Sequence, residues 1–294
     1  MPPNQDTEQL PQVVSFSGGR TSSYLCHRLL QEYPRDRLHF VFMDTGCEHP
    51  KTYEFIRKVD AHFGLDLVCL RGDFDSPMGV GVKPVRVPID GIGPDMGPLR
   101  GLSQKYGTFT VKMPWCTSRA KEVVHDKWCG DAFGPGGFVT WIGVRADEPK
   151  RLGRMGANPL HRFLAEVDEA DKADVLAFWA AMPFDLEIPE WLGNCVFCVK
   201  KSSLKLAVAA RDEPEVAAEW AAMLAAAPDR LKMEGLTSEN VYRGHRTLAQ
   251  VCGMYADATR DELAARVRTT RATDANSCSE SCEVFVSPQL DLFD

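Results

Sequence analysis

The 294-residue chain contains no long apolar run. A membrane-spanning helix needs roughly 18 or more consecutive apolar residues, and no stretch approaches that length. Residues 1–12 are polar and hold no apolar signal core. We therefore expect a cytoplasmic protein that has no membrane partner.

The sequence also lacks internal repeats and an excess of positive charge. Its formal net charge is −7, so the molecule as a whole will not attract nucleic acid non-selectively. Any site for an anion must then be a local group of hydrogen-bond donors and cations. The length fits one large α/β domain with an added subdomain, or two domains that share an interface.

Residues 13–25 predict a strand, a glycine turn and a helix, in that order. The turn lacks the Gly-Lys-Ser/Thr of a Walker loop and the Gly-x-Gly-x-x-Gly of a dinucleotide site. It still directs several backbone N–H groups and the positive end of a helix dipole at one point, where hydroxyl side chains add donors. A phosphate site and an ordinary Gly-Gly connection are both compatible with this pattern. The candidate binding residues are Ser15, Ser17, Gly18, Gly19, Arg20, Thr21 and Ser22.

Strand-like and helical segments alternate after this turn. Apolar runs at 38–43 and 67–70 flank a helical pattern at 50–63, which predicts a parallel sheet with helices on its faces. Ligands of such sheets lie beyond the carboxyl ends of the strands. Further candidates follow two strand-like runs and belong to the same rim. They are Asp44, Thr45, Gly46 and Arg145.

The chain divides into three predicted parts. An α/β core that carries the candidate phosphate site spans 1–160 and contains a Gly- and Pro-rich insertion at 73–113, which is either a lid over the ligand or a surface insertion. A helical region that carries a Cys-x-x-Cys motif spans 161–270. Residues 271–294 are expected to form a mobile tail.

Ten cysteines without a signal sequence point to thiols, metal ligands or redox centres rather than to disulfides. Cys195 and Cys198 form a Cys-x-x-Cys pair and precede Lys200 and Lys201, cations that favour the thiolate form. The pair is compatible with half of a zinc site, an iron–sulfur site, a redox dithiol or two buried residues.

The best third ligand is Cys116. It begins a predicted helix close to Lys121, so the helix dipole and nearby cations stabilise its thiolate. The alternative is a helix-start residue that packs against Trp115. Cys47 and Cys129 lie beside turn glycines with no partner in view.

The order of these motifs resembles the phosphoadenosine phosphosulfate (PAPS) reductase family. The Ser-Gly-Gly-x-x-Ser turn is similar to the PP-loop of that family and of the ATP pyrophosphatases, and the resemblance covers about residues 13–205. More narrowly, the chain is similar to phage and bacterial PAPS reductase-like proteins, whose relatives include DNA phosphorothioation and tRNA thiolation enzymes. The motifs that carry the resemblance are residues 17–22, 44–46 together with 48–50 and 52–55, 116–121, 143–148 and 195–198.

The resemblance implies an adenine nucleotide α-hydrolase-like fold, with a parallel-sheet core, helices on both faces and a helical C-terminal region. The PP-loop would cradle the phosphates of ATP or of PAPS, and Asp44 would lie near the ribose or near Mg²⁺-bound phosphates. Arg145 and Lys121 would meet the phosphate or sulfate anion. Arg20 departs from the Asp that the pyrophosphatases usually carry at this position.

Iron–sulfur members of the family hold a [4Fe–4S] cluster on paired cysteines and a Cys-x-x-Cys. Here the first of the pair is Cys116, but the second is Thr117. Three thiolates, from Cys116, Cys195 and Cys198, would leave one iron open to sulfide or substrate. Cys252 is a remote fourth candidate or a core residue, and zinc is the alternative metal.

Reductases of the family carry a nucleophilic cysteine in a terminal Glu-Cys-Gly-Leu/Ile-His segment, which this chain lacks. Cys278 and Cys282 stand in the tail instead, as a nucleophile on a mobile arm or as part of a polar tail. We therefore favour an ATP-dependent adenylating sulfurtransferase whose acceptor is DNA, RNA or a small molecule. The alternatives are reduction of PAPS or adenylylsulfate with a thioredoxin-like partner, and nucleotide binding with structural zinc.

Overall fold

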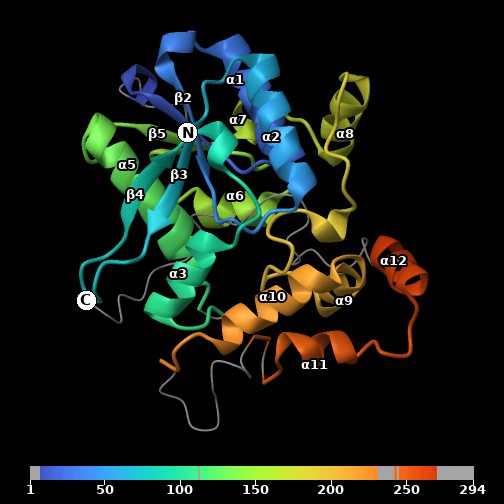
Figure 1. Ribbon diagram of the computed structural model, residues 1–294. Helices are drawn as coiled ribbons and strands as arrows, with labels where there is room; N and C mark the ends of the chain where they lie inside the picture. Colours follow the sequence, from blue (N-terminus) through green and yellow to red (C-terminus); the bar gives the residue numbers. More distant parts are fainter. Residues whose placement is uncertain (1–6, 112, 231–241, 244, 270–294) are drawn as a thin grey trace.

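The computed structural model describes residues 7–111, 113–230, 242–243 and 245–269. Its centre is a six-stranded sheet with the order β4-β3-β2-β1-β5-β6 (Figure 1). Neighbouring strands are parallel except β3 and β4, which are antiparallel. The predicted α/β fold is confirmed, and β4 and β6 are additional strands. The strands are β1 (Gln12–Phe16), β2 (Leu38–Met43), β3 (Val68–Asp73), β4 (Lys83–Val87), β5 (Val139–Ile142) and β6 (His161–Phe163).

Helices surround the sheet in the described ranges. A π-helical turn, Ser118–Glu122, joins α4 to α5, and a 3-10 turn, Glu190–Leu192, precedes the Cys-x-x-Cys motif. The α-helices are α1 (Arg20–Glu32), α2 (Pro50–Phe63), α3 (Gly97–Tyr106), α4 (Trp115–Thr117), α5 (Val123–Phe133), α6 (Pro149–Met155), α7 (Leu164–Val167), α8 (Lys172–Ala181), α9 (Ser203–Asp212), α10 (Pro214–Ala225), α11 (Leu248–Gly253) and α12 (Arg260–Thr269).

Alternate side chains of the central strands enter two cores on opposite faces of the sheet. Val14 and Phe16 of β1 pack in one core with α1, α2 and α8. Val13 of β1 and Val41 of β2 pack in the other with α5, α9 and α10. Successive strand residues point to opposite faces, so apolar residues in succession require helices on both sides (Figure 1).

The strand order reverses at β1. The chain runs from β1 out to β3 on one side and later adds β5 on the other. The carboxyl ends of β1 and β5 therefore form a topological switch point, where open α/β sheets bind ligands. A Cβ added to Gly143 would lie 3.1 Å from Ser22 Cα, so the residues after β5 closely approach the start of α1.

The insertion at 73–113 contains β4 and α3. β4 pairs with β3 at the edge of the sheet, and Arg100 of α3 forms an ion pair with Glu219 of α10 at 2.7 Å. The Met96 N–H donates to the Gly46 carbonyl at 2.8 Å. The insertion therefore borders the turn that follows β2.

Helices α9 to α12 lie together below the sheet in Figure 1, and α9 contacts the other three. Residues 231–241, 244 and 270–294 lie outside the described residues. The expected tail, with Cys278 and Cys282, is among them. In the part of the chain that the structure describes, no helix is both long and apolar enough to span a membrane.

Candidate functional site

The glycine turn between β1 and α1 is held by serine hydrogen bonds. The Ser17 N–H donates to Ser22 Oγ at 3.2 Å, and the two hydroxyls lie 2.9 Å apart. Gly18 has a φ of +77°, and a Cβ there would lie 2.8 Å from Ile56 Cδ1, so glycine is required. No side chain of the described residues caps α1 at Gly19. The first N–H groups of the helix are thus available to an anion.

Arg145 reaches this turn from the end of β5. Its Nη1 lies 3.3 Å from Thr21 Oγ1, and its Nε donates to Asp147 Oδ1 at 2.8 Å. The Arg145 N–H also donates to Glu148 Oε2 at 3.1 Å. The guanidinium is largely buried, and it adds a fixed cation to the positive end of α1.

Asp44 follows β2 and is buried with all its carboxylate oxygens hydrogen-bonded. Its Oδ1 accepts from the Tyr53 hydroxyl at 2.8 Å and from the Gly46 N–H at 2.9 Å. Its Oδ2 accepts from Arg71 nitrogens at 2.6 and 2.8 Å. These donors hold the turn after β2 in place and fix its position at the rim of the sheet.

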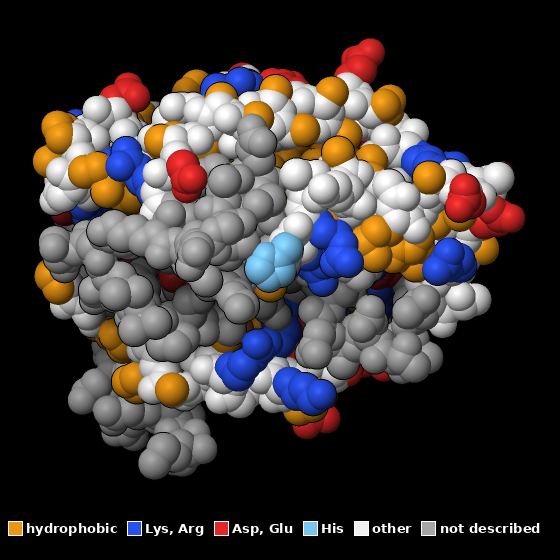
Figure 2. Space-filling view, turned by 90° about the horizontal axis from the view of Figure 1, so that it is seen from below, with side chains coloured by type: hydrophobic (Ala, Val, Ile, Leu, Met, Phe, Trp, Pro, Cys, Tyr) orange, Lys and Arg blue, Asp and Glu red, His pale blue; other side chains and the backbone are white. Residues whose placement is uncertain are grey.

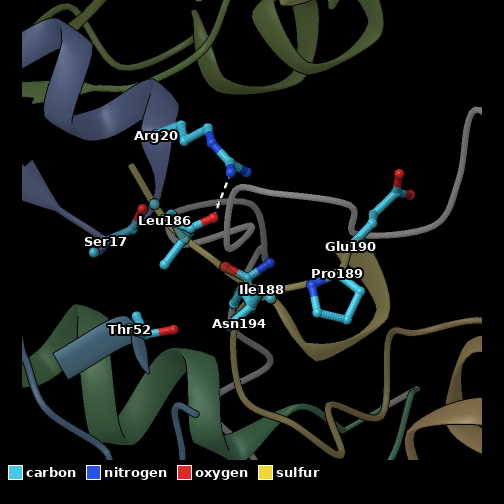
Figure 3. Close-up of a pocket in the computed structure, with 11 residues that line it drawn as sticks. Ser17, Arg20, Thr52, Leu186, Ile188, Pro189, Glu190 and Asn194 are labelled. Carbon is cyan, nitrogen blue, oxygen red and sulfur yellow. Dashed lines mark hydrogen bonds between the residues drawn. The ribbon is translucent and has the colours of Figure 1, made fainter. Parts of the chain in front are cut away.

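A pocket opens between the glycine turn and the segment that leads into Cys195 (Figure 3). Thr52 of α2 lies on the side of the glycine turn, and residues 186–194 form the opposite wall. Asn194 has a φ of +55°, and its Nδ2 is buried without a hydrogen-bond partner among the described residues. The pocket therefore contains a buried donor directly before Cys195 in the chain.

Arg20 connects the two walls of this pocket. Its guanidinium forms a two-point ion pair with Asp185 at 2.7 and 2.9 Å. It also donates to the Leu186 carbonyl, the dashed line in Figure 3. Arg20 was predicted to bind the ligand. In the structure its guanidinium instead binds Asp185 and Leu186 and so holds that segment against α1.

Cys195 is buried against the turn that follows β2. Its Sγ lies 3.4 Å from Thr45 Oγ1 and 3.5 Å from Glu48 Oε1. Lys121 Nζ lies 3.9 Å from the same Glu48 oxygen. Burial raises the pKa of Cys195 well above its usual range, Glu48 adds to the rise, and Lys121 opposes it. The thiol, the carboxylate and the ammonium therefore form one buried group.

Glu48 stands in a motif that carries the family resemblance, but the sequence analysis gave it no role of its own. Its side chain is 3% exposed, and its Oε2 has no hydrogen-bond partner among the described residues. Burial raises the pKa of Glu48, while Lys121 and the hydrogen bond with Cys195 oppose the rise. A buried carboxyl group beside a thiol is a candidate proton acceptor.

Cys116 and Cys198 lie near the buried Tyr242. The Tyr242 hydroxyl donates to the Phe197 carbonyl within the Cys-x-x-Cys turn. Burial raises the pKa of Tyr242 well above its usual range, and Cys198, Cys252 and Cys116 add to the rise in that order. The Tyr242 hydroxyl therefore binds the Cys-x-x-Cys turn, and the Cys116 and Cys252 thiols influence the same phenol group.

Lys201 is fully buried and holds the Cys-x-x-Cys turn from within. Its Nζ donates to the Trp191 carbonyl at 2.6 Å and to the Val196 carbonyl at 2.9 Å. Burial lowers the pKa of Lys201 to about 8, and the neighbouring Cys198 and Cys195 oppose the shift. The sequence identified this lysine as a nearby cation but gave no sign of its burial.

Comparison with known proteins identifies the family. Residues 11–76, which include the glycine turn and Asp44, match the phosphoadenosine phosphosulfate reductase domain. An uncharacterized nin region protein, ORF290 of Escherichia phage lambda, is 41% identical over 288 residues, which cover 95% of this chain and 97% of that protein. This chain belongs to the phage-type PAPS reductase-like family. Uncharacterized protein MJ0066 of Methanocaldococcus jannaschii is 35% identical over 63 residues, which are 21% of this chain and 13% of that protein.

In this PAPS reductase-like protein, the predicted site residues fall into two adjoining groups. The PP-loop and Arg145 form one group, which is predicted to bind an anion and is called the anion-facing group. In the other group, Lys121 and Cys195 lie beside Glu48, and Thr45 contacts Cys195. Ser15 is buried in the middle of the sheet, paired with strands on both sides. The ligands proposed for both groups remain predictions.

The thiols contain one unexpected member. The Cys47 carbonyl accepts from the Val196 N–H at 3.0 Å, so the turn at Cys47 lies against the Cys-x-x-Cys turn. The position of Cys47 follows from the packing of the turn after β2 against the Cys-x-x-Cys turn. The local sequence gives no sign of this packing. Across the described residues, no three His, Cys, Asp or Glu side chains already stand at a spacing that would hold one metal ion.

Proposed function

We propose that this protein is a PP-loop enzyme that uses ATP to adenylate an acceptor and then exchanges the adenylate for sulfur. The observation that carries the proposal is one pocket, whose walls are the PP-loop and the segment that leads into Cys195. A nucleotide bound there would contact the anion-facing group and the residues next to the thiols. This arrangement supports phosphate chemistry and sulfur chemistry in adjoining sites.

The adenylation step uses donors that the fold already holds in place. An acceptor oxygen attacks the α-phosphorus of ATP, a new P–O bond forms, the bond to the bridging oxygen breaks, and pyrophosphate leaves. The PP-loop N–H groups, Arg145 and Mg²⁺ would stabilise the charge that develops on the leaving group. The buried Nδ2 of Asn194 is a further donor for the nucleotide.

The sulfur step follows at the thiols. A sulfur nucleophile attacks the adenylated acceptor, and AMP leaves with the bonding electrons. Cys116, Cys195 and Cys198 would hold a [4Fe–4S] cluster, which when bound supplies redox-active iron beside the nucleotide. Thiol donors suit this group, and the buried cations Lys121 and Lys201 would offset thiolate charge.

The acceptor is proposed to be an anion, most simply a nucleic acid. Figure 2 shows the molecule from below, with Lys and Arg side chains near the centre of this face and Asp and Glu mainly toward its edges. The net charge of −7 therefore does not exclude a local group of cations on this face. Local positive charge of this kind attracts phosphate backbones.

The matched domain supports a second candidate function, the reduction of PAPS. A thiolate of Cys278 or Cys282 would attack the sulfur, and adenosine bisphosphate would leave. A thiol of a thioredoxin-like partner would then attack that cysteine, release sulfite and form a disulfide. Both cysteines lie outside the described residues.

Two measurements on the anaerobic protein test the two functions: calorimetric titration with ATP–Mg²⁺ and with PAPS reports nucleotide binding, and the sulfite released from PAPS reports reduction. We expect ATP to bind to the wild type and to Cys195→Ser. We expect PAPS to yield no sulfite. Sulfite release that disappears when residues 272–294 are removed would assign the reductase function instead. Failure of both nucleotides to bind would overturn the proposal as a whole.

A further inference from the structure

We propose that Cys47 is the fourth thiolate ligand of the metal centre, beside Cys116, Cys195 and Cys198. The inference rests on the iron–sulfur part of the proposed function and changes its coordination. The sequence places the Asp-Thr-Gly turn with the nucleotide site. The inference gives Cys47, the residue that follows this turn, a separate role at the metal centre.

Backbone and side-chain contacts fasten the turn around Cys47 to the Cys-x-x-Cys turn. The Cys47 carbonyl accepts from the Val196 N–H at 3.0 Å. Thr45 and Glu48, on either side of Cys47 in the chain, lie 3.4 and 3.5 Å from Cys195 Sγ. Cys47 and Cys195 are both buried, with 4% and 8% exposure, and belong to the same hydrophobic core.

The four thiols belong to the same packed region. Cys47 and Cys195 are buried members of one hydrophobic core, and Cys116 and Cys198 are partly buried and pack against that core. Burial raises the pKa of Cys47, with Glu48, Asp44 and Cys116 adding to the rise and Lys121 opposing it.

Two of the other described cysteines lie on the far side of the sheet, and two have hydrogen-bond partners of their own. Cys26 and Cys69 pack in the core on the opposite face of the sheet. Cys129 Sγ lies 3.7 Å from His125 Nε2. Cys252, the fourth ligand considered from the sequence, has its Sγ 3.8 Å from a carbonyl of α9. Cys47 is thus better placed than Cys252.

Four thiolates fit a cluster better than a single ion in this structure. Each thiolate of a [4Fe–4S] cluster binds a different iron, so the cluster does not need the close spacing that one ion requires. A four-thiolate cluster carries net negative charge, and the buried Lys121 and Lys201 provide compensation. No iron would then keep an open position, so the transferred sulfur must come from a separate donor such as sulfide or a persulfide.

The test compares the full-length wild type with Cys47→Ser, using Cys69→Ser as a matched control at a buried cysteine and Cys252→Ser as the rival. Iron, zinc and acid-labile sulfide are measured per chain after anaerobic reconstitution, with ATP binding as the check on folding. Each protein is then oxidised with ferricyanide and examined by electron paramagnetic resonance. A cluster with an incomplete thiolate set loses an iron readily and gives the signal of a three-iron cluster.

We expect about four irons per chain in the wild type and in Cys69→Ser, without a three-iron signal. Cys47→Ser should lose most of its iron or give that signal, while it still binds ATP. Equal iron content and equal resistance to oxidation in Cys47→Ser and the wild type would overturn the inference, as would loss in Cys252→Ser alone. A wild type with zinc that Cys47→Ser loses would support the fourth thiolate and overturn the iron–sulfur part of the proposed function. ATP binding without any metal would overturn the inference and leave adenylation standing.

Discussion

Nη1 of Arg145 lies 3.3 Å from Oγ1 of Thr21, which joins the end of β5 to the first turn of α1 across the switch point of the sheet. Two segments that are more than a hundred residues apart in the chain thereby form one anion-facing surface. The same contact places a cation where the helix dipole already favours negative charge.

Arg145→Ala should weaken ATP binding while the protein stays folded. A hydrogen bond to a charged group contributes about 1.5 to 3 kcal/mol, so we expect a loss of roughly 10- to 100-fold in affinity by calorimetric titration. Arg86→Ala, on the exposed β4, is the matched control and should bind like the wild type. Unchanged affinity in Arg145→Ala would remove this residue from the nucleotide site.

Gly18→Ala should abolish ATP binding through the shape of the turn. Both the positive φ and the 2.8 Å approach to Ile56 oppose a side chain at Gly18, and the left-handed conformation alone costs about 1 to 2 kcal/mol. Gly134→Ala provides a control, because Gly134 has a φ of +84° with no atom within 4 Å of an added Cβ. Urea unfolding should show destabilisation in both variants, but only Gly18→Ala should lose nucleotide binding.

The Arg20–Asp185 ion pair should stabilise both the folded protein and the pocket wall to which Asp185 leads. Alanine variants at each position and at both should give a coupling energy of about 1 kcal/mol in urea unfolding, because the pair is bidentate and partly buried. Each single variant should also weaken ATP binding by releasing the wall at 185–189. The exposed pair Arg35–Asp66 serves as a control whose coupling should be close to zero. An equally small coupling at Arg20–Asp185 would show that the pair does not hold the wall.

Tyr24 should make stability depend on pH on the alkaline side. Burial raises the pKa of Tyr24 to about 12, and its 2.6 Å hydrogen bond to Asp168 adds to the rise. The unfolded chain loses this proton near pH 10, so the folded state binds the proton more tightly. The stabilisation is therefore complete below about pH 10 and is lost as pH rises toward about 12.

Tyr24→Phe should flatten that part of the profile, measured as the urea midpoint against pH. Tyr255→Phe should keep the loss seen in the wild type. Thiol ionisation affects all three proteins alike, so the difference between the variants isolates Tyr24. A Tyr24→Phe profile that falls as steeply as the wild type would contradict the assignment.

The sequence was most informative where neighbouring residues act together. The glycine turn, the helix that follows it and the rhythm of strands are local features, and the structure has them where the periodicity predicts. Gly18 could be identified from the sequence as a turn residue because glycine is the residue type that most easily adopts a positive φ. Glu48 and Cys47 were given no role because their importance depends on contacts with the Cys-x-x-Cys segment, about 150 positions later in the chain.

By itself the sequence determined the elements and the chemical types present: a PP-loop, a rim of polar residues after the strands, and thiols with cations nearby. These follow from periodicity, turn chemistry and side-chain identity, which act over a few residues. Only the tertiary structure decided that β5 lies beside β1, that Arg20 binds Asp185, and that the turn at Cys47 packs against the Cys-x-x-Cys turn. Such pairings depend on how the two cores pack on the two faces of the sheet. A residue that is buried by contacts with distant parts of the chain shows no sign of this burial in the local sequence pattern.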